Sequence, residues 1–188
     1  MRIAFLYAGL NDLDILSCDI ANAYLNAECT EKLWYEAGAE FGSDKGKVMI
    51  LGKAVCGLKS AANAWRQTLL EVIQGMGYVP NKGDQDLYTR KAKNSKGEWY
   101  YEWLLVYVDD LLCISENPRR TIDGLSKAYD LKDSVRRPER YLGANAHKWR
   151  MPTGDQEFWA TSPTDYVKNA VKQVKRILED RGEAVPTP

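Results

Sequence analysis

Two adjacent acids interrupt an otherwise apolar stretch between Trp103 and Ile114, and few folds accommodate such a pattern. The stretch reads Trp-Leu-Leu-Val-Tyr-Val-Asp-Asp-Leu-Leu-Cys-Ile. Apolar runs rich in Val, Leu and Tyr on both sides of a two-residue break predict two strands of a tight β-hairpin, with Asp109 and Asp110 at its tip. A solvated turn is one explanation, because Asp hydrogen-bonds its own backbone and tolerates turn angles.

A bound cation is the other explanation for this pair of acids. Two ionised carboxylates repel each other, and burial beside apolar strands disfavours their ionisation further. A divalent cation would relieve both effects, since hard cations take oxygen ligands. The two acids alone leave both explanations open, and a third carboxylate is needed to decide between them.

Asp19 is the candidate for that third carboxylate, because it lies at the end of an apolar strand predicted over residues 13–20. Three carboxylates brought together by neighbouring strands would hold two metal ions roughly 3.5–4 Å apart, an arrangement used for in-line phosphoryl displacement. This interpretation requires pairing between segments some 90 positions apart, which a local pattern does not establish.

The remaining pattern predicts an α+β fold, in which helices cover one face of an antiparallel sheet. Further strands are expected over residues 33–37, 48–51 and 87–90, and short helices over 21–27 and 118–129. A longer helix begins after Ser60, a plausible N-cap, and buries the stripe Trp65, Leu69, Val72, Ile73 and Met76. The last helix has Ser162 as its cap, Pro163 at its first position and Gly182 after its end. Its docking face comprises Val167, Ala170, Val171, Val174, Ile177 and Leu178.

Composition favours a soluble protein of the cytoplasm, or of the nucleus, that is not secreted. No apolar run reaches the 18 or so residues of a membrane span, and the N-terminal segment lacks a cleavage site. The four cysteines have no CxxC spacing, which indicates free thiols in a reducing setting. The formal net charge of +0 argues against a wholly basic nucleic-acid binder. Residues 45–70 nevertheless carry five basic residues and no acid, a block that faces either phosphates or solvent.

Four segments resemble the reverse transcriptases of the Ty1/copia retrotransposon family, in the family's order. Residues 19–26, Asp-Ile-Ala-Asn-Ala-Tyr-Leu-Asn, resemble its first catalytic motif. Residues 55–65, Val-Cys-Gly-Leu-Lys-Ser-Ala-Ala-Asn-Ala-Trp, resemble its Gly-Leu-Lys-Gln-Ser-Pro-Arg-Ala-Trp segment. Tyr107-Val-Asp-Asp110 matches the signature of the polymerase hairpin, and Tyr141-Leu-Gly143 resembles a segment that contacts the primer end.

The resemblance implies a polymerase palm that synthesises DNA on an RNA or DNA template from deoxynucleoside triphosphates, with two Mg²⁺ or Mn²⁺ ions. It implies that Asp19, Asp109 and Asp110 are catalytic metal ligands, and that Ile20 offers its backbone carbonyl. Tyr24 matches the aromatic residue that blocks the sugar 2′-hydroxyl, with a half-buried structural aromatic as the alternative. The other substrate-binding positions implied are Asn26, Gly57, Lys59 and Tyr107.

The chain also departs from the family pattern. Ser60-Ala-Ala-Asn63 replaces Gln-Ser-Pro-Arg, so an arginine and a proline are missing. Only residues 1–12 precede the strand that leads into the first motif, where the family has a long fingers region that grips the triphosphate. We therefore expect a partial palm over residues 1–145, with fingers largely missing, and a C-terminal extension over 146–188. The rest of a retrotransposon polyprotein is a possible partner.

Other classes of function fit the sequence less well. The alternative to an active polymerase is a catalytically inactive, retrotransposon-derived remnant that binds nucleic acid or another protein. A hydrolase with a histidine base has little support, because His147 is the single histidine and no Gly-x-Ser-x-Gly elbow occurs. Zinc binding lacks the required ligand spacing.

Overall fold

A computed structural model describes residues 2–132, 135–150, 152, 154 and 157–184 of the chain. These residues form two compact units, which are considered one at a time. The larger unit is Asp14–Arg136, and the smaller one combines Met1–Leu13 with Arg137–Pro188. The division expected from sequence, at residue 145, stays a prediction.

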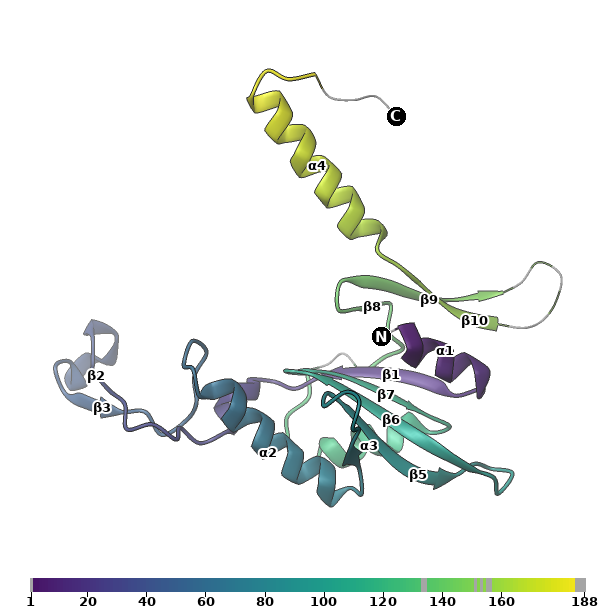
Figure 1. The fold of residues 1–188 in the computed structure, drawn as a ribbon. Helices are drawn as coiled ribbons and strands as arrows, with labels where there is room; N and C mark the ends of the chain where they lie inside the picture. The colour runs from purple at the N-terminus through teal and green to yellow at the C-terminus, as the bar shows by residue number, and fades with distance from the viewer. Residues whose placement is uncertain (1, 133–134, 151, 153, 155–156, 185–188) are drawn as a thin grey trace. The chain divides into compact units, whose positions relative to one another are not determined.

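The larger unit is built on a five-stranded antiparallel sheet, in the order β1-β7-β6-β5-β4 (Figure 1). This sheet confirms the predicted mixture of helices with antiparallel strands. The bounds are β1 Asp14–Asp19, β4 Val79–Pro80, β5 Leu87–Lys93, β6 Trp99–Tyr107 and β7 Asp110–Ser115. Five of the six residues of β7 are buried, which explains why this strand reads as a continuous apolar run.

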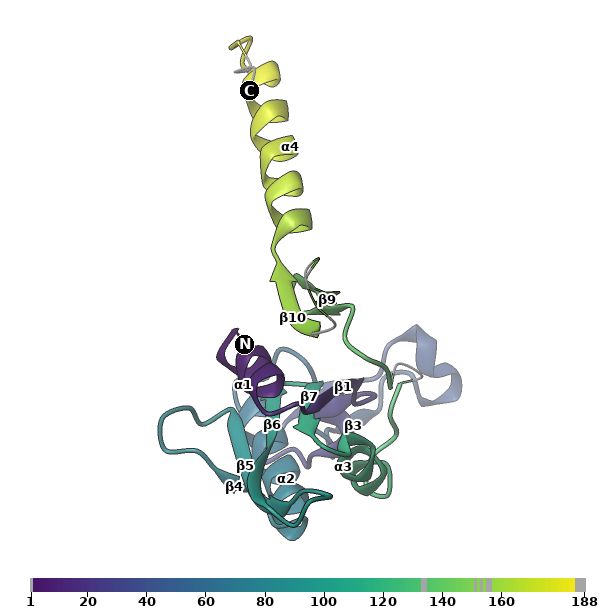
Figure 2. The ribbon, with the colours of Figure 1, turned by 90° about the vertical axis from the view of Figure 1, so that its right-hand side faces the viewer.

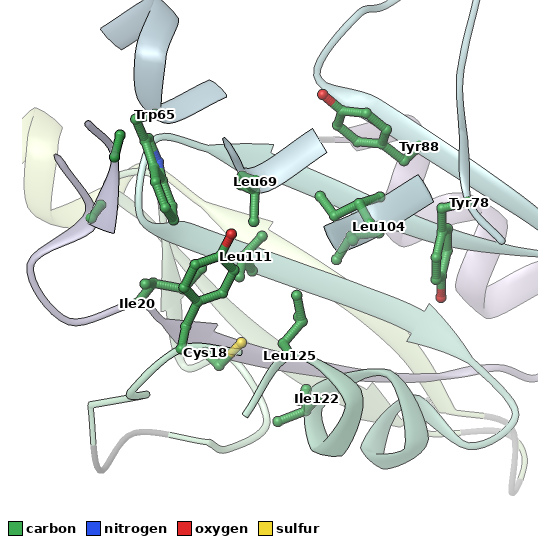
Figure 3. Packing of buried hydrophobic residues seen from close by; sticks show 14 of the residues in the cluster. Cys18, Ile20, Trp65, Leu69, Tyr78, Tyr88, Leu104, Leu111, Ile122 and Leu125 are labelled. Atoms are coloured by element: carbon green, nitrogen blue, oxygen red, sulfur yellow. The ribbon is translucent and has the colours of Figure 1, made fainter. Parts of the chain in front are cut away.

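Two helices, α2 (Ala61–Gly75) and α3 (Pro118–Leu125), cover one face of this sheet. Their side chains point toward the strand residues Leu104 and Leu111 (Figure 3). The predicted stripe of α2 is confirmed, since Trp65, Leu69 and Ile73 are buried and the rest of the stripe packs against the same core. Burial of these large apolar side chains, at roughly 1.5–3 kcal/mol each, is what fixes the helices to the sheet.

Several helix ends differ from the sequence prediction. Ser60 is the N-cap residue of α2 as predicted, but its side chain makes no capping hydrogen bond. The helix expected over residues 118–129 ends at Leu125, because the chain turns there to place the buried Tyr129 against the ring of Trp65. The short helix expected over 21–27 is a 3₁₀ turn, η1, at Ala23–Asn26.

A buried polar network joins the strands to the C-terminal end of α2. Arg90 of β5 pairs with Glu102 of β6, with 2.5 Å between a guanidinium nitrogen and a carboxylate oxygen. Arg90 also donates to the carbonyl oxygen of Met76 and lies over the ring of Tyr78, 4.4 Å from its centroid. The hydroxyl of Tyr78 bonds that of Thr121 on α3, so both helices are tied to this network.

A separate two-stranded ribbon lies in the segment between η1 and α2. Its strands are β2 (Trp34–Glu36) and β3 (Val48–Ile50), joined through a 3₁₀ segment, η2, at Ala39–Asp44. Both predicted strands are therefore confirmed. Trp34, Val48 and Ile50 are exposed, and the ribbon stands away from the five-stranded sheet (Figure 1).

The smaller unit contains a helix, α1, and a three-stranded sheet, and neither was predicted from the sequence. Helix α1 spans Arg2–Leu10, and the sheet has the order β10-β9-β8, with β8 at Arg140–Tyr141, β9 at Ala144–Arg150 and β10 at Glu157–Ser162. The ring of Phe5 on α1 meets that of Trp159 on β10 edge to face, with centroids 5.4 Å apart. The turn between β8 and β9 has positive φ at both Leu142 and Gly143, as a two-residue hairpin requires.

Helix α4 (Thr164–Asp180) follows β10 as one straight helix (Figure 2). Ser162 lies in β10, where its hydroxyl accepts a hydrogen bond from the backbone N–H of Thr164, and Gly182 has the left-handed φ of 70° expected after a helix end. The predicted docking face is largely exposed, with Val167, Val171, Val174 and Ile177 all about half accessible. Within the part of the chain that the structure describes, no helix is long and apolar enough to cross a membrane.

Candidate active site

The register of β1 against β7 brings the early acid to the later pair. The two strands run antiparallel, and the Cα of Asp19 lies directly opposite that of Asp110. On the other side of β7, Asp110 is paired with Tyr107 of β6. Asp19, Asp110 and Tyr107 therefore form a row across three neighbouring strands at one end of the sheet.

This row lies on the face of the sheet opposite the two helices. Side chains alternate between faces along a strand. In β7, Leu111 and Cys113 belong to the core shared with α2 and α3, so Asp110 points to the other face. Cys18 and Ile20 pack in the same core, which places Asp19 with Asp110. The helices thus support the carboxylates from behind without covering them.

The hairpin tip is displaced by one residue from its expected position. Asp110 is the first residue of β7, so the two residues of the turn are Val108 and Asp109. The prediction that both acids form the tip was wrong by this one step. As a result Asp109 projects from the turn, whereas Asp110 is held by strand pairing on both sides.

Two hydrogen bonds hold the turn against its surroundings. The backbone N–H of Ile20 donates to the carbonyl oxygen of Asp109 over 2.9 Å. The indole N–H of Trp65 donates to the carbonyl oxygen of Val108 over 2.7 Å. Val108 has φ 58°, a left-handed conformation that is unfavourable for a β-branched residue. The turn is therefore strained, and its neighbours from β1 and α2 maintain it.

Lys132 provides the positive charge of the site. Its Nζ lies 2.5 Å from Oδ1 of Asp19 and 3.7 Å from Oδ2 of Asp109. The backbone N–H of Lys132 also donates to the carbonyl oxygen of Asp19 over 2.9 Å. Sequence reasoning missed this residue, because nothing in its neighbourhood marks the short segment after α3 as a partner of β1.

The surroundings of Asp110 change the pKa of its carboxyl group. Partial burial raises the pKa of the Asp110 carboxyl, the charges of Asp109 and Asp19 raise it further, and Lys132 opposes them. The hydrogen bond to Asp19 is the main cause that raises the pKa of Lys132, so the ammonium is held in its charged form. Among the described residues, no group of three or more His, Cys, Asp or Glu side chains converges in a way that could hold a metal ion.

Tyr24 lines a pocket of about 370 Å³ between α2 and the hairpin. Trp65, Arg66 and Tyr88 contribute to the same wall, as do Tyr107 and Val108 of the hairpin. The pocket therefore offers an aromatic surface on the helix side of the sheet, and it reaches the hairpin turn through Val108, whereas none of the three acids lines it. Tyr24 is half-buried on η1, which leaves its predicted role as a sugar gate compatible with its position but untested.

The other predicted substrate-binding residues lie in different surroundings. The side-chain amide of Asn26 donates to the carbonyl oxygens of Ala21 and Asn22, so it fastens the η1 turn. Gly57 is exposed with φ 100° in the loop before α2, where Lys59 is exposed as well. Ile20 is fully buried beside Asp109. The roles assigned to these residues stay predictions.

Comparison with known proteins identifies the class of protein that this fold and site represent. A family model described as "Reverse transcriptase (RNA-dependent DNA polymerase)" matches residues 2–186, and the chain belongs to this family. Its relatives are Pol proteins of Ty1/copia-type retrotransposons, which confirms the resemblance found in the motifs.

The matched relatives include proteins from yeast and plants. A putative transposon Ty5-1 protein of Saccharomyces cerevisiae is 29% identical over 69% of this chain. The retrovirus-related Pol polyprotein from transposon RE1 of Arabidopsis thaliana is 32% identical over 74% of the chain. The chain spans 42% of the first relative and 9% of the second, so it corresponds to part of a longer protein in both comparisons.

Proposed function

We propose that this chain performs RNA- or DNA-templated DNA synthesis, with its larger unit acting as a polymerase palm. The observation that carries the proposal is the pairing of Asp19 with Asp110 at one end of an antiparallel sheet, next to Asp109 in the turn. Membership of the reverse transcriptase family supplies the reaction class.

The donor set suits Mg²⁺ or Mn²⁺. Carboxylate oxygens are the ligands that such hard cations prefer. Burial and mutual repulsion disfavour the charged form of Asp110, and a nearby cation would reverse this effect. Asp19, Asp109 and Asp110 would hold two ions, with the backbone carbonyl of Ile20 as a further ligand. When bound, such ions activate a primer hydroxyl and stabilise the charge on the reacting phosphate.

The protein's own contribution is the placement of these groups. Strand pairing fixes Asp110, while the hydrogen bonds from Ile20 and Trp65 fix the backbone of the turn that carries Asp109. The strands and the buried indole of Trp65 would hold the reacting groups in a narrow range of orientations. Such orientation of the reacting groups can lower the reaction barrier substantially.

Substrate selection would depend on the aromatic pocket between α2 and the hairpin. In this proposal Tyr24 blocks a 2′-hydroxyl, and Tyr107, Asn26, Gly57 and Lys59 line the approach of the nucleotide or template. Templates, deoxynucleoside triphosphates and the remainder of a polyprotein are the proposed partners. The fingers that grip the triphosphate would belong to that remainder, since the chain spans only part of its relatives. The four cysteines are free, which supports an intracellular setting.

An inactive remnant that binds nucleic acid or protein is the second candidate. Two observations favour it: Ser60–Asn63 departs from the family segment, and the ammonium of Lys132 lies among the carboxylates. The two candidates share a fold and differ only in catalysis.

Primer extension separates the candidates. The wild-type chain is supplied with a primed RNA or DNA template, deoxynucleotides and Mg²⁺ or Mn²⁺, beside the variants Asp110→Asn and Asp123→Asn. Asp123 is an exposed residue paired with Arg119, so it controls for the loss of one charge. We expect extension by the wild type and by Asp123→Asn, and a loss on the order of a hundredfold or more in Asp110→Asn. Extension that persists in Asp110→Asn would remove the acid row from the mechanism. Template binding without any extension would favour the remnant.

A further inference from the structure

Lys132 places a positive charge where the proposed cations would bind, so its ammonium opposes metal binding. We propose that the Lys132 ammonium is a displaceable counter-ion, which neutralises the carboxylates without metal and competes with a divalent cation for them. The inference rests on the proposed function, because it assumes that these carboxylates bind such a cation.

The position of the ammonium supports direct competition. Nζ lies against Oδ1 of Asp19 and within ion-pair distance of Oδ2 of Asp109, so it bridges the two elements that carry the acids. Each oxygen that accepts from the ammonium has one lone pair fewer to offer a metal. A cation that binds both residues also meets the repulsion of this ammonium, so it binds more readily once the side chain of Lys132 has moved away.

The backbone of the same segment is fixed beside β1. Besides the bond from Lys132 to Asp19, the N–H of Ala21 donates to the carbonyl oxygen of Asp130 over 2.8 Å. Ile20 and Leu131 form an antiparallel bridge between these two bonds. The segment 130–132 thus runs alongside residues 19–21, and it delivers the lysine side chain to the acids whatever else the chain binds.

The side chain itself is free to leave. Its relative exposure is 52%, and its four-carbon stem gives the ammonium several rotamers that reach solvent. The pair is exposed on one side, so its net strength is modest. A doubly charged ion attracts the same carboxylates more strongly than a single ammonium does. Because the backbone of Lys132 is fixed and its side chain can move, the ammonium can leave the carboxylates when a metal binds and return when the metal dissociates.

Competition raises the apparent Kd for the metal. The apparent Kd equals the intrinsic Kd divided by the fraction of molecules in which the ammonium has left the carboxylates. Replacing Lys132 with methionine keeps most of the aliphatic stem and removes the charge. We expect the Kd for Mn²⁺ to fall by about twofold to fivefold in Lys132→Met, since an exposed ion pair has a strength of that order. Lys132→Arg retains the positive charge, and its Kd is expected to stay near the wild-type value.

The test is isothermal titration calorimetry of the whole chain with MnCl₂, without nucleotide or template. Lys127→Met is the matched control, because Lys127 is an exposed lysine that makes neither of these ion pairs and its loss changes the net charge equally. It is expected to change the Kd by less than about twofold, through long-range charge alone. A larger fall in the Kd for Mn²⁺ in Lys132→Met than in Lys127→Met would support the inference. Equal effects, or weaker binding by Lys132→Met, would overturn it.

Asp110→Asn separates failure of the inference from failure of the metal site. If the wild type binds Mn²⁺, Asp110→Asn does not, and Lys132→Met matches Lys127→Met, then the metal site stands and the inference fails. If neither the wild type nor Lys132→Met binds Mn²⁺, the metal site itself fails. Melting in EDTA gives a second readout. Lys132→Met should melt below Lys127→Met, because only its carboxylates have lost their counter-ion, and equal melting temperatures would contradict that role.

Discussion

The indole nitrogen of Trp65 on α2 lies 2.7 Å from the carbonyl oxygen of Val108 in the hairpin turn. Trp65 is 2% exposed and belongs to the helix-facing core, whereas its hydrogen bond ends at the turn that carries Asp109. The interpretation of Trp65 as a core residue is thus confirmed, and the same side chain also supports the backbone that carries Asp109.

Trp65→Phe should separate these two contributions. Phenylalanine keeps an aromatic ring in the core but loses the N–H donor and leaves a partly filled cavity. We expect a loss of about 1–3 kcal/mol in the free energy of unfolding, measured by urea denaturation. Trp34→Phe, on the exposed face of the β2–β3 ribbon, is the control and should lie within about 0.5 kcal/mol of the wild type. Equal losses in both variants would contradict a specific role for the indole bond.

Val108 tests the strain in the same turn. Its φ of 58° is costly for any residue with a Cβ and acceptable for glycine. We expect Val108→Gly to be more stable than Val108→Ala by about 1 kcal/mol, because alanine retains the penalty and glycine does not. Thermal unfolding of the two variants measures this difference. A more stable alanine variant would show that the turn is relaxed.

Asp110→Asn should stabilise the protein while it removes activity. The fold raises the pKa of Asp110, so the folded state binds this proton more tightly than the unfolded chain. Stability from this group is therefore lost as pH rises from the usual carboxyl range through the raised pKa. We expect Asp110→Asn to raise the Tm by about 2 °C at pH 7 in EDTA, the scale of a sub-kilocalorie to one-kilocalorie change in a chain of this size. The gain should shrink below about pH 4, where the wild-type carboxyl is protonated in both states. A gain that is the same at both pH values would exclude this electrostatic origin.

The buried pair of Arg90 with Glu102 predicts an asymmetric response to mutation. Glu102 is 4% exposed, so Arg90→Met leaves a buried carboxylate without its main partner. We expect a cost of about 3–5 kcal/mol in the free energy of unfolding, and recovery of most of it in the double variant Arg90→Met/Glu102→Leu. Arg119→Met breaks an ion pair in which both side chains are 60% exposed, and it should cost less than about 1 kcal/mol. Similar costs for the two single variants would contradict the importance of burial.

Tyr24→Val tests the proposed sugar gate. If the ring blocks a 2′-hydroxyl, a smaller side chain should lower the ratio of kcat/KM for deoxynucleotides over ribonucleotides by about tenfold or more. Tyr35→Val on the ribbon is the control and should leave this ratio unchanged. A variant that loses activity toward both sugars equally would indicate that Tyr24 supports the fold of η1 instead.

Local patterns predicted the larger unit well. The stripe of α2 repeats at helical spacing over five positions, and the two arms of the hairpin are apolar enough to be recognised without context. The strands around Trp34 and Val48 are bounded by glycine turns, which also mark them in the sequence. These elements depend mainly on residues close together in the chain.

Features that depend on distant partners were missed or misplaced. Lys132 reaches the acids only because residues 130–132 pair with residues 19–21, a contact with no local signal. The tip of the hairpin is shifted because Asp110 pairs with β1 as well as with β6. Helix α1 and strand β9 lack caps or regular alternation, and α4 has the amphipathic pattern of a packed helix although its apolar side is exposed.

The β1–β7 register limits how the length of this chain can change. Deleting one residue inside β1 would exchange its two sets of side chains, so that Cys18 would replace Asp19 opposite Asp110. The turn at residues 94–97, where Gly97 has φ 82°, links β5 to β6 at the opposite end of these strands from the acids, so an added residue there leaves the β1–β7 register unchanged. We therefore expect copies of such an element to tolerate insertions and deletions in that turn, and to lose function with a single one in β1.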